Sequence, residues 1–186
     1  MKSSRRGTVD PFIVMDVMEA ARQAEQSGRS IIHMKVGQPG TAAPKAARHV
    51  LASQLEQGEA MGYTVALGLP ELRQQIADLY QTSYGLELNP ERVVITPGSS
   101  GAFILAFSSL FDTGARVGIG APGYPSYRQI LKSLDLVPVD LPTSEEAYLQ
   151  PMAADFATLD LQGLLVASPA NPSGTMLDRG ALTGLI

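Results

Sequence analysis

Apolar side chains recur at a helical period in the first half of the chain. Between Phe12 and Ala21 they are spaced three or four residues apart. Asp10 is a candidate N-cap, and Pro11 is expected at the first helical position. Gly28 then provides a stop signal. The same pattern predicts two further helices, over residues 44–57 and 70–80.

Short apolar runs, which are typical of buried strands, dominate the second half. They cover residues 93–96, 115–120, 136–140 and 163–168, and an earlier extended run covers residues 30–36. Predicted helices ending near Phe111 and Leu134 separate them. This alternation indicates an α/β fold, with a parallel sheet and helices on both of its faces. Right-handed crossovers then bring the turns after Thr96, Gly120 and Ser168 to one edge of the sheet, where such sheets bind ligands.

The composition excludes several classes of protein. The net charge of −4 argues against nucleic-acid binding, which needs clustered positive charge. Without cysteine the chain has no disulfides or thiolate metal sites, and two histidines leave little room for a histidine-rich metal cluster. The 18 glycines and 13 prolines exceed the usual share of ~12%, so shaped turns are where we look for function.

Targeting and membrane signals are weak. The basic start, residues 1–6, resembles the opening of a signal peptide, but Asp10, Pro11 and Asp16 interrupt any apolar region after it. The longest strongly apolar stretch, residues 102–107, is far below the ~20 residues that a membrane span needs. We therefore expect a soluble cytoplasmic protein that has no contact with membranes.

The first candidate binding turn is the sequence Gly98-Ser99-Ser100-Gly101, between a predicted strand and a predicted helix. The N–H groups of the helix start and the two hydroxyls form a cup suited to a phosphate. The turn is neither a Walker A loop nor a GxGxxG dinucleotide motif. The alternative is that Ser99 or Ser100 merely caps the helix.

The second candidate is the turn of residues 122–127 (PGYPSY), directly after the next strand. Two prolines and a glycine stiffen it, so Tyr124 is presented with little conformational freedom and its ring can stack on a planar ligand. The alternative is that Tyr124 closes the core beneath the turn.

The third candidate is Asn171, which lies between Pro169 and Pro172. The prolines restrict the backbone and aim the side-chain amide, and the Asn171–Pro172 bond is a candidate for the cis form. An ordinary turn would also use these residue types. Tyr63 and Gly37 are weaker candidates, and Tyr63 alternatively packs on the following helix.

Taken in order, these segments resemble the first half of the class I/II aminotransferases, the aspartate-aminotransferase-like enzymes that use pyridoxal 5′-phosphate (PLP). The resemblance covers roughly residues 10–186. Its motifs are residues 36–39 (VGQP), Tyr63, 68–73 (GLPELR), 95–102 (ITPGSSGA), 122–127 (PGYPSY) and 171–174 (NPSG). Asn-Pro-x-Gly alone is moderately specific, whereas the ordered set is strongly so.

The resemblance implies a role for each candidate residue. Gly98, Ser99 and Ser100 match the phosphate cup of PLP, and Tyr124 matches the aromatic residue that stacks on its pyridine ring. Asn171 matches the asparagine that donates a hydrogen bond to the 3′-oxygen of the ring. Tyr63 resembles the tyrosine that reaches the phosphate in the neighbouring subunit, which implies a homodimer. Gly37 matches a glycine whose backbone contacts the substrate carboxylate.

The lysine that the family's chemistry requires has no match in this sequence. That amine binds the cofactor covalently and moves a proton, and it lies in a Ser-x-x-Lys segment after the asparagine. The lysines of this chain are Lys2, Lys35, Lys45 and Lys132, and none has that context. The acidic partner of the pyridinium, a basic phosphate ligand and the arginine that binds the substrate carboxylate are also expected beyond Asn171. We therefore assign no catalytic residue and expect an N-terminal fragment that is inactive by itself.

The resemblance also implies the fold. We expect a three-layer α/β/α large domain with a mostly parallel sheet, incomplete, and an N-terminal helical segment. Residues 1–40 are expected to form the N-terminal arm, a helix and a small-domain segment, and residues 41–186 the partial PLP-binding domain. Asp178 is a candidate N-cap of a last helix.

Several functions stay open besides amino-group transfer between an amino acid and a 2-oxo acid. Carbon–sulfur lyases, decarboxylases and synthases share these motifs. A non-catalytic regulatory domain of the same fold would need a basic helix-turn-helix segment, and only nine residues precede the first predicted helix. A nicotinamide-binding module would need a GxGxxG motif after its first strand, and the sequence has none.

Overall fold

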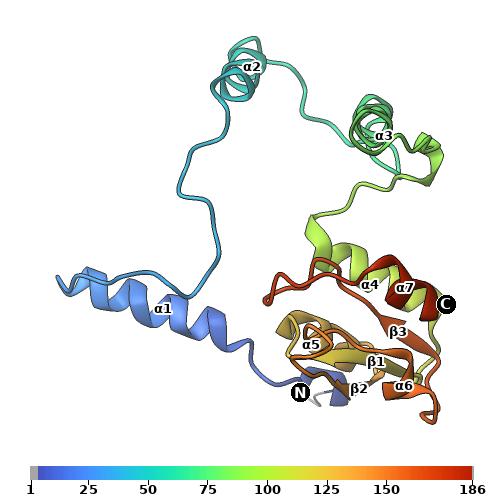
Figure 1. Cartoon of the computed structure of the whole chain (residues 1–186). Coiled ribbons are helices and arrows are strands. Elements are labelled where there is room, and N and C mark those ends of the chain that lie inside the picture. Colours follow the sequence, from blue (N-terminus) through green and yellow to red (C-terminus); the bar gives the residue numbers. More distant parts are fainter. Residues whose placement is uncertain (1–3, 186) are drawn as a thin grey trace. The chain divides into compact units, whose positions relative to one another are not determined.

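The computed structural model describes residues 4–185 (Figure 1). The contacts within the chain divide it into two units. One unit combines the N-terminal residues up to Glu19 with the chain from Pro97 onward, and the other is Ala20–Thr96. Helix α1 (Ile13–Gln26) begins in the first unit and ends in the second. The boundary that the sequence predicts at residue 40 stays a prediction.

The first unit is built on a parallel sheet of three strands. Its strands are β1 (Arg116–Ala121), β2 (Val137–Pro142) and β3 (Gly163–Leu165), in the order β2-β1-β3. Ile119 of β1 lies opposite Asp140 of β2 and Leu165 of β3. Both pairings are parallel, as expected for short apolar strands joined through helices. The α/β class with an incomplete parallel sheet is therefore confirmed.

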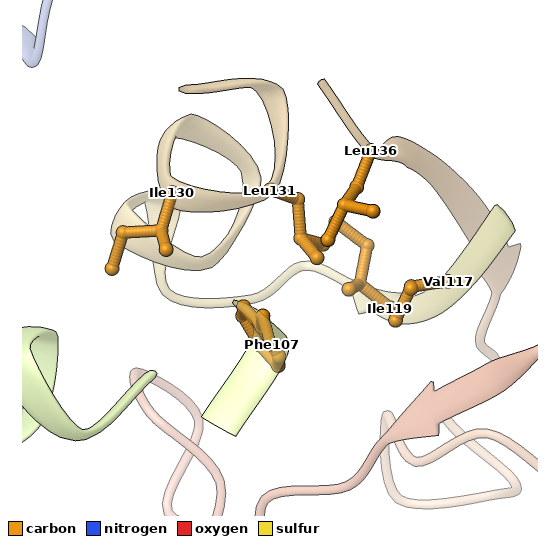
Figure 2. Close-up of a cluster of buried hydrophobic side chains, with 6 residues drawn as sticks. All are labelled: Phe107, Val117, Ile119, Ile130, Leu131 and Leu136. Carbon is orange, nitrogen blue, oxygen red and sulfur yellow. The ribbon is translucent and has the colours of Figure 1, made fainter. Parts of the chain in front are cut away.

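Two helices of this unit pack with the sheet around one apolar core. Helix α4 (Gly98–Leu110) supplies Phe107, and helix α5 (Pro125–Ser133) supplies Ile130 and Leu131. Figure 2 shows these side chains converging with others from β1 and from the approach to β2. The members of the core are Phe107, Val117, Ile119, Ile130, Leu131 and Leu136. Since Leu131 is completely buried, α5 is fixed against β1 by its apolar face.

Short helices complete the first unit. They are η1 (Arg5–Gly7), α6 (Ala153–Phe156) and α7 (Arg179–Gly184). The Asp178 side chain accepts a hydrogen bond from the Ala181 N–H at 2.7 Å. The predicted N-cap of the last helix is therefore confirmed.

The second unit consists of helices and extended connections. Helices α2 (Lys45–Glu56) and α3 (Pro70–Tyr84) lie close to their predicted ranges, and the short helix η2 (Pro90–Arg92) follows them. Helix α3 starts at its proline and ends at Gly85, which adopts the left-handed conformation. The apolar side chains of α2 stay largely exposed, at 54 to 60% for Val50, Leu51 and Leu55.

Two predicted strands are wrong. In the segment 93–96, the Val93 carbonyl accepts a hydrogen bond from Arg73 Nε at 3.0 Å, and the Ile95 N–H donates to the Leu67 carbonyl at 3.0 Å. These backbone groups are thus paired with a side chain and a loop instead of a strand ladder. In the run 30–36, Ile32 and Met34 are 86% and 89% exposed. An extended run becomes a strand only beside another strand.

The predicted start of the first helix is also wrong. Helix α1 begins at Ile13, so Asp10 and Pro11 precede it. The Asp10 carboxylate forms an ion pair with Lys132 of α5 instead of capping α1, which sequence alone does not show. Within residues 4–185, no helix combines the length and apolarity needed to cross a membrane.

Candidate functional site

The predicted phosphate cup lies at the N-terminus of α4. The helix begins at Gly98, directly after Pro97, and Ser99 and Ser100 lie exposed in its first turn. Pro97 occupies the N-cap position and makes no side-chain capping hydrogen bond, while Ser99 and Ser100 lie inside the helix. The alternative that either serine caps the helix is therefore wrong. Gly98 has a φ of +77° and open space where a Cβ would stand.

Tyr124 lies where β1 leads into α5, as the residue before Pro125. Its ring is 6.1 Å from the Phe12 ring at an interplanar angle of 87°, and 5.4 Å from the Tyr127 ring at 79°. Tyr127 in turn meets Phe103 of α4 at 5.0 Å. Tyr124 is thus held by edge contacts with Phe12 and Tyr127, and neither neighbouring ring is stacked on it.

The Tyr127 hydroxyl has a raised pKa. Burial raises the pKa of the Tyr127 hydroxyl above its ordinary value, and the adjacent Tyr124 adds to the shift. Tyr127 is therefore a neutral phenol at neutral pH. It can donate a hydrogen bond into the space that it lines.

Asn171 and Tyr124 lie around the same carboxyl end of β1. Asn171 lines a cavity of about 30 Å³, and Tyr124 lines a second cavity of about 50 Å³. Gly120, Gly123 and Tyr127 form part of the wall of both. Parallel strands place ligands at this end of a sheet, so the two predicted turns meet where the topology requires.

The loop that carries Asn171 is closed by its own backbone. The Ala170 N–H donates to the Thr175 carbonyl at 2.8 Å, and the Gly174 N–H donates to the Ala170 carbonyl at 2.7 Å. The Asn171–Pro172 bond is cis, as the sequence predicted.

Gln150, which the sequence analysis did not single out, also belongs to this site. It lines the cavity of Asn171, and only 2% of its surface is exposed. The pattern around it, between Leu149 and Pro151, contains no signal that separates it from an ordinary loop glutamine.

The remaining candidates lie in the unit Ala20–Thr96. Tyr63 is fully exposed, so the alternative that it packs on the following helix is wrong. Gly37 has open space where a Cβ would stand. The roles that the resemblance implies for these two residues stay predictions. Within the described residues, no group of three or more histidine, aspartate or glutamate side chains is placed to hold a metal ion.

The segment before α1 is attached to the site. Asp10 pairs with Lys132, and Phe12 meets Tyr124. Lys132, through its hydrogen bond and its charge, lowers the pKa of Asp10, and Arg128 adds to the effect. Because the native pKa is depressed, the pair stabilises the fold above the ordinary aspartate pKa and ceases to do so as the pH falls through the native value.

Replacing Asp10 by asparagine is therefore expected to reduce the acid sensitivity of the first unit. The thermal midpoint of the wild type should fall more steeply below about pH 4 than that of Asp10→Asn. Circular dichroism melts from pH 2.5 to pH 6 measure this, and Lys132→Met should behave like Asp10→Asn. Lys45→Met, in the other unit, is the control. Parallel curves for the wild type and Asp10→Asn would contradict the prediction.

The parallel sheet and its helices are consistent with an incomplete α/β domain of the PLP-transferase fold. Around the carboxyl end of β1 lie the turn that carries Tyr124 and the loop that carries Asn171, and helix α4 belongs to the same unit. The chain belongs to the family of class I and II aminotransferases, whose model matches residues 29–186.

Relatives in sequence and structure agree with this family. The chain is 45% identical to the valine–pyruvate aminotransferase of Mycobacterium tuberculosis, across 97% of the chain and 47% of the relative. It matches the crystal structure of an aminotransferase from the same organism with a TM-score of 0.92 and 42% identity, across 100% of the chain and 48% of that structure. A structure described as an aminotransferase from Silicibacter pomeroyi is 65% identical, with a TM-score of 0.87, across 100% of the chain and 47% of that structure. The chain thus spans about half the length of these relatives.

Proposed function

We propose that this chain is the cofactor-binding first half of a PLP-dependent aminotransferase, which moves an amino group from an amino acid to a 2-oxo acid. The observation that carries the proposal is the meeting of the Tyr124 turn and the Asn171 loop at the carboxyl end of β1. The M. tuberculosis relative is named for valine and pyruvate, an amino acid and a 2-oxo acid of this class.

The residues present fit PLP. A phosphate dianion needs clustered donors and a positive environment, which the first turn of α4 offers through its N–H groups and the hydroxyls of Ser99 and Ser100. The open space beside Gly98 leaves room for an anion at that helix end. Tyr124 offers an aromatic ring for the pyridine, and the Asn171 amide offers a donor for the 3′-oxygen.

When bound, PLP supplies an electron sink for the carbon that exchanges its amino group. The residues of this chain bind the cofactor and orient it. The α4 terminus binds the phosphate, Tyr124 restricts the tilt of the ring, and the Asn171 N–H stabilises negative charge on the 3′-oxygen. Gly37 binds the substrate carboxylate through its backbone. Tyr63 reaches the phosphate in the neighbouring subunit of a homodimer. The protein is proposed to act in the cytoplasm.

The complete reaction needs a lysine that the sequence of 186 residues does not supply. None of its lysines lies in a Ser-x-x-Lys segment. Lys132 pairs with Asp10, and Lys35 contacts His33. The two cavities at the site, about 30 and 50 Å³, are also far smaller than the ~300 Å³ or more of a typical ligand pocket. We propose that further residues, as in the relatives of about twice the length, complete the walls and supply the amine.

The chain alone is expected to bind PLP weakly and not to turn over. Equilibrium dialysis should show Tyr124→Ala weakening PLP binding about tenfold, since ring–ring contacts contribute about 0.5–1.5 kcal/mol beyond the buried area. Tyr148→Phe is the control, because Tyr148 is 71% exposed and lines neither cavity. Equal affinities for the wild type and Tyr124→Ala would contradict the assignment of Tyr124.

Borohydride reduction in the presence of PLP, without an amino acid that would compete with lysine for the cofactor, tests the proposed lack of a catalytic lysine. The expected result is no stoichiometric labelling of any lysine by mass spectrometry. Stoichiometric labelling at one lysine would overturn the inactivity of the chain alone.

A further inference from the structure

Gln150 lies in the connection between β2 and α6, outside any helix or strand, and is one of the most deeply buried side chains of the chain. A primary amide in an apolar interior is costly unless its donors are satisfied. The hydrogen bonds that Gln150 Nε2 donates go to Ala167 and Thr175, which flank the Asn171 loop.

The amide spans the base of that loop. Gln150 Nε2 donates to the Ala167 carbonyl at 3.2 Å, just after β3, and to the Thr175 carbonyl at 2.9 Å, on the returning side. The Thr175 hydroxyl oxygen lies 3.2 Å away as a third contact. An amide nitrogen carries two hydrogens, so one side chain connects both ends of the segment that contains Asn171.

The contact at Thr175 also connects to the interior of the loop. The Thr175 carbonyl accepts hydrogen bonds from Gln150 Nε2 and from the N–H of Ala170, which is the residue next to Asn171. The Thr175 hydroxyl lies 2.8 Å from the Ser173 hydroxyl. Gln150 and Asn171 line the same cavity. A methionine at position 150 would fill the same space but leave both carbonyl groups without this donor.

We propose that Gln150 is a positioning residue: it holds the Asn171 loop in the conformation that presents the Asn171 amide to the 3′-oxygen of PLP. The cofactor part of this inference rests on the proposed function. The ordering of the loop by Gln150 is independent of it.

Amide hydrogen exchange of the chain tests the ordering directly. In Gln150→Met, exchange at the Ala170 and Gly174 amides is expected to accelerate about tenfold, since the loss corresponds to about one hydrogen bond. Gln129→Met is the matched control, because Gln129 Oε1 is buried without a hydrogen-bond partner among the described residues. Wild-type exchange rates at both amides in Gln150→Met would overturn the proposal.

A second variant separates hydrogen bonding from packing. In Gln150→Glu, the protonated carboxyl group can donate, whereas the ionised one only accepts. The protonated carboxyl group has one hydrogen where the amide nitrogen has two, so loop protection relative to wild type should recover in part at low pH. Gln150→Met should stay unprotected at every pH. Equally low protection of Gln150→Glu at every pH would show that donation is not what orders the loop.

PLP binding tests whether Gln150 affects the cofactor by positioning Asn171. Equilibrium dialysis should show Gln150→Met weakening PLP binding about three- to tenfold, with no further loss when it is added to Asn171→Ala. Additive losses would overturn the positioning role. If the wild-type chain binds no PLP while Gln150→Met still accelerates loop exchange, PLP binding by this chain alone is contradicted and the ordering of the loop by Gln150 stands.

Discussion

Replacing Leu131 by alanine is expected to lower the free energy of unfolding of the sheet-containing unit by about 3 to 5 kcal/mol. Leu131 is completely buried in the core formed by α4, α5 and β1. The substitution removes apolar contacts and leaves a cavity between α5 and the sheet, which these packed neighbours cannot fill completely. Because α5 follows directly from the Tyr124 turn, the same change should loosen one wall of the site.

Urea unfolding followed by circular dichroism measures the effect of Leu131→Ala. Leu110→Ala is the matched control, since Leu110 lies at the end of α4 and is 71% exposed. The control is expected to stay within about 0.5 kcal/mol of wild type, as for most exposed substitutions. A loss below about 1 kcal/mol in Leu131→Ala would contradict the assignment of this core.

Replacing Gly68 by alanine is expected to destabilise the unit Ala20–Thr96 by about 2 to 4 kcal/mol, from two separate causes. Gly68 has a φ of +95°, which L-residues with a Cβ rarely adopt. A Cβ at this position would also stand 2.4 Å from Cγ1 and 2.5 Å from Cβ of Ile95, so one of the two segments must move. The loop between Tyr63 and α3 is joined to this segment by the hydrogen bond from the Ile95 N–H to the Leu67 carbonyl.

Two glycines of the same unit separate these causes. Gly58 has a positive φ of +71° but open space, so Gly58→Ala measures the backbone strain alone, about 1 kcal/mol. Gly62 has open space and no such φ, so Gly62→Ala should be close to neutral. Thermal melts of the three variants give the comparison. If Gly68→Ala is no less stable than Gly58→Ala, the added Cβ is accommodated beside Ile95 with no loss in the free energy of unfolding.

The features that the sequence predicted correctly are local ones. The ranges of α2, α3, α4 and α5 follow from their apolar residues, together with proline in the first turn of α3 and α5 and glycine at the end of α3. The turns carrying Ser99, Tyr124 and Asn171 follow from clustered glycine and proline. The parallel sheet follows from the alternation of short apolar strands with helices.

The errors and omissions concern partners that are distant in sequence. The segment 93–96 was predicted as a strand, but its backbone pairs with Arg73 and Leu67. Asp10 was predicted as a helix cap, but its carboxylate pairs with Lys132, 122 residues away. A backbone N–H or a carboxylate takes whichever partner the folded chain brings near, and sequence spacing does not reveal that choice.

By itself, the sequence determined the kind of protein and the turns that carry its candidate site, because each motif is a local arrangement of a few residues with its own conformational preference. Only the tertiary structure decided that Tyr124 and Asn171 line neighbouring cavities that share Gly120, and that Gln150 donates hydrogen bonds to both ends of the Asn171 loop. Both depend on parallel strands and a connecting loop meeting at one edge of a sheet. That meeting depends on burial across the whole unit, so no single stretch of sequence contains it.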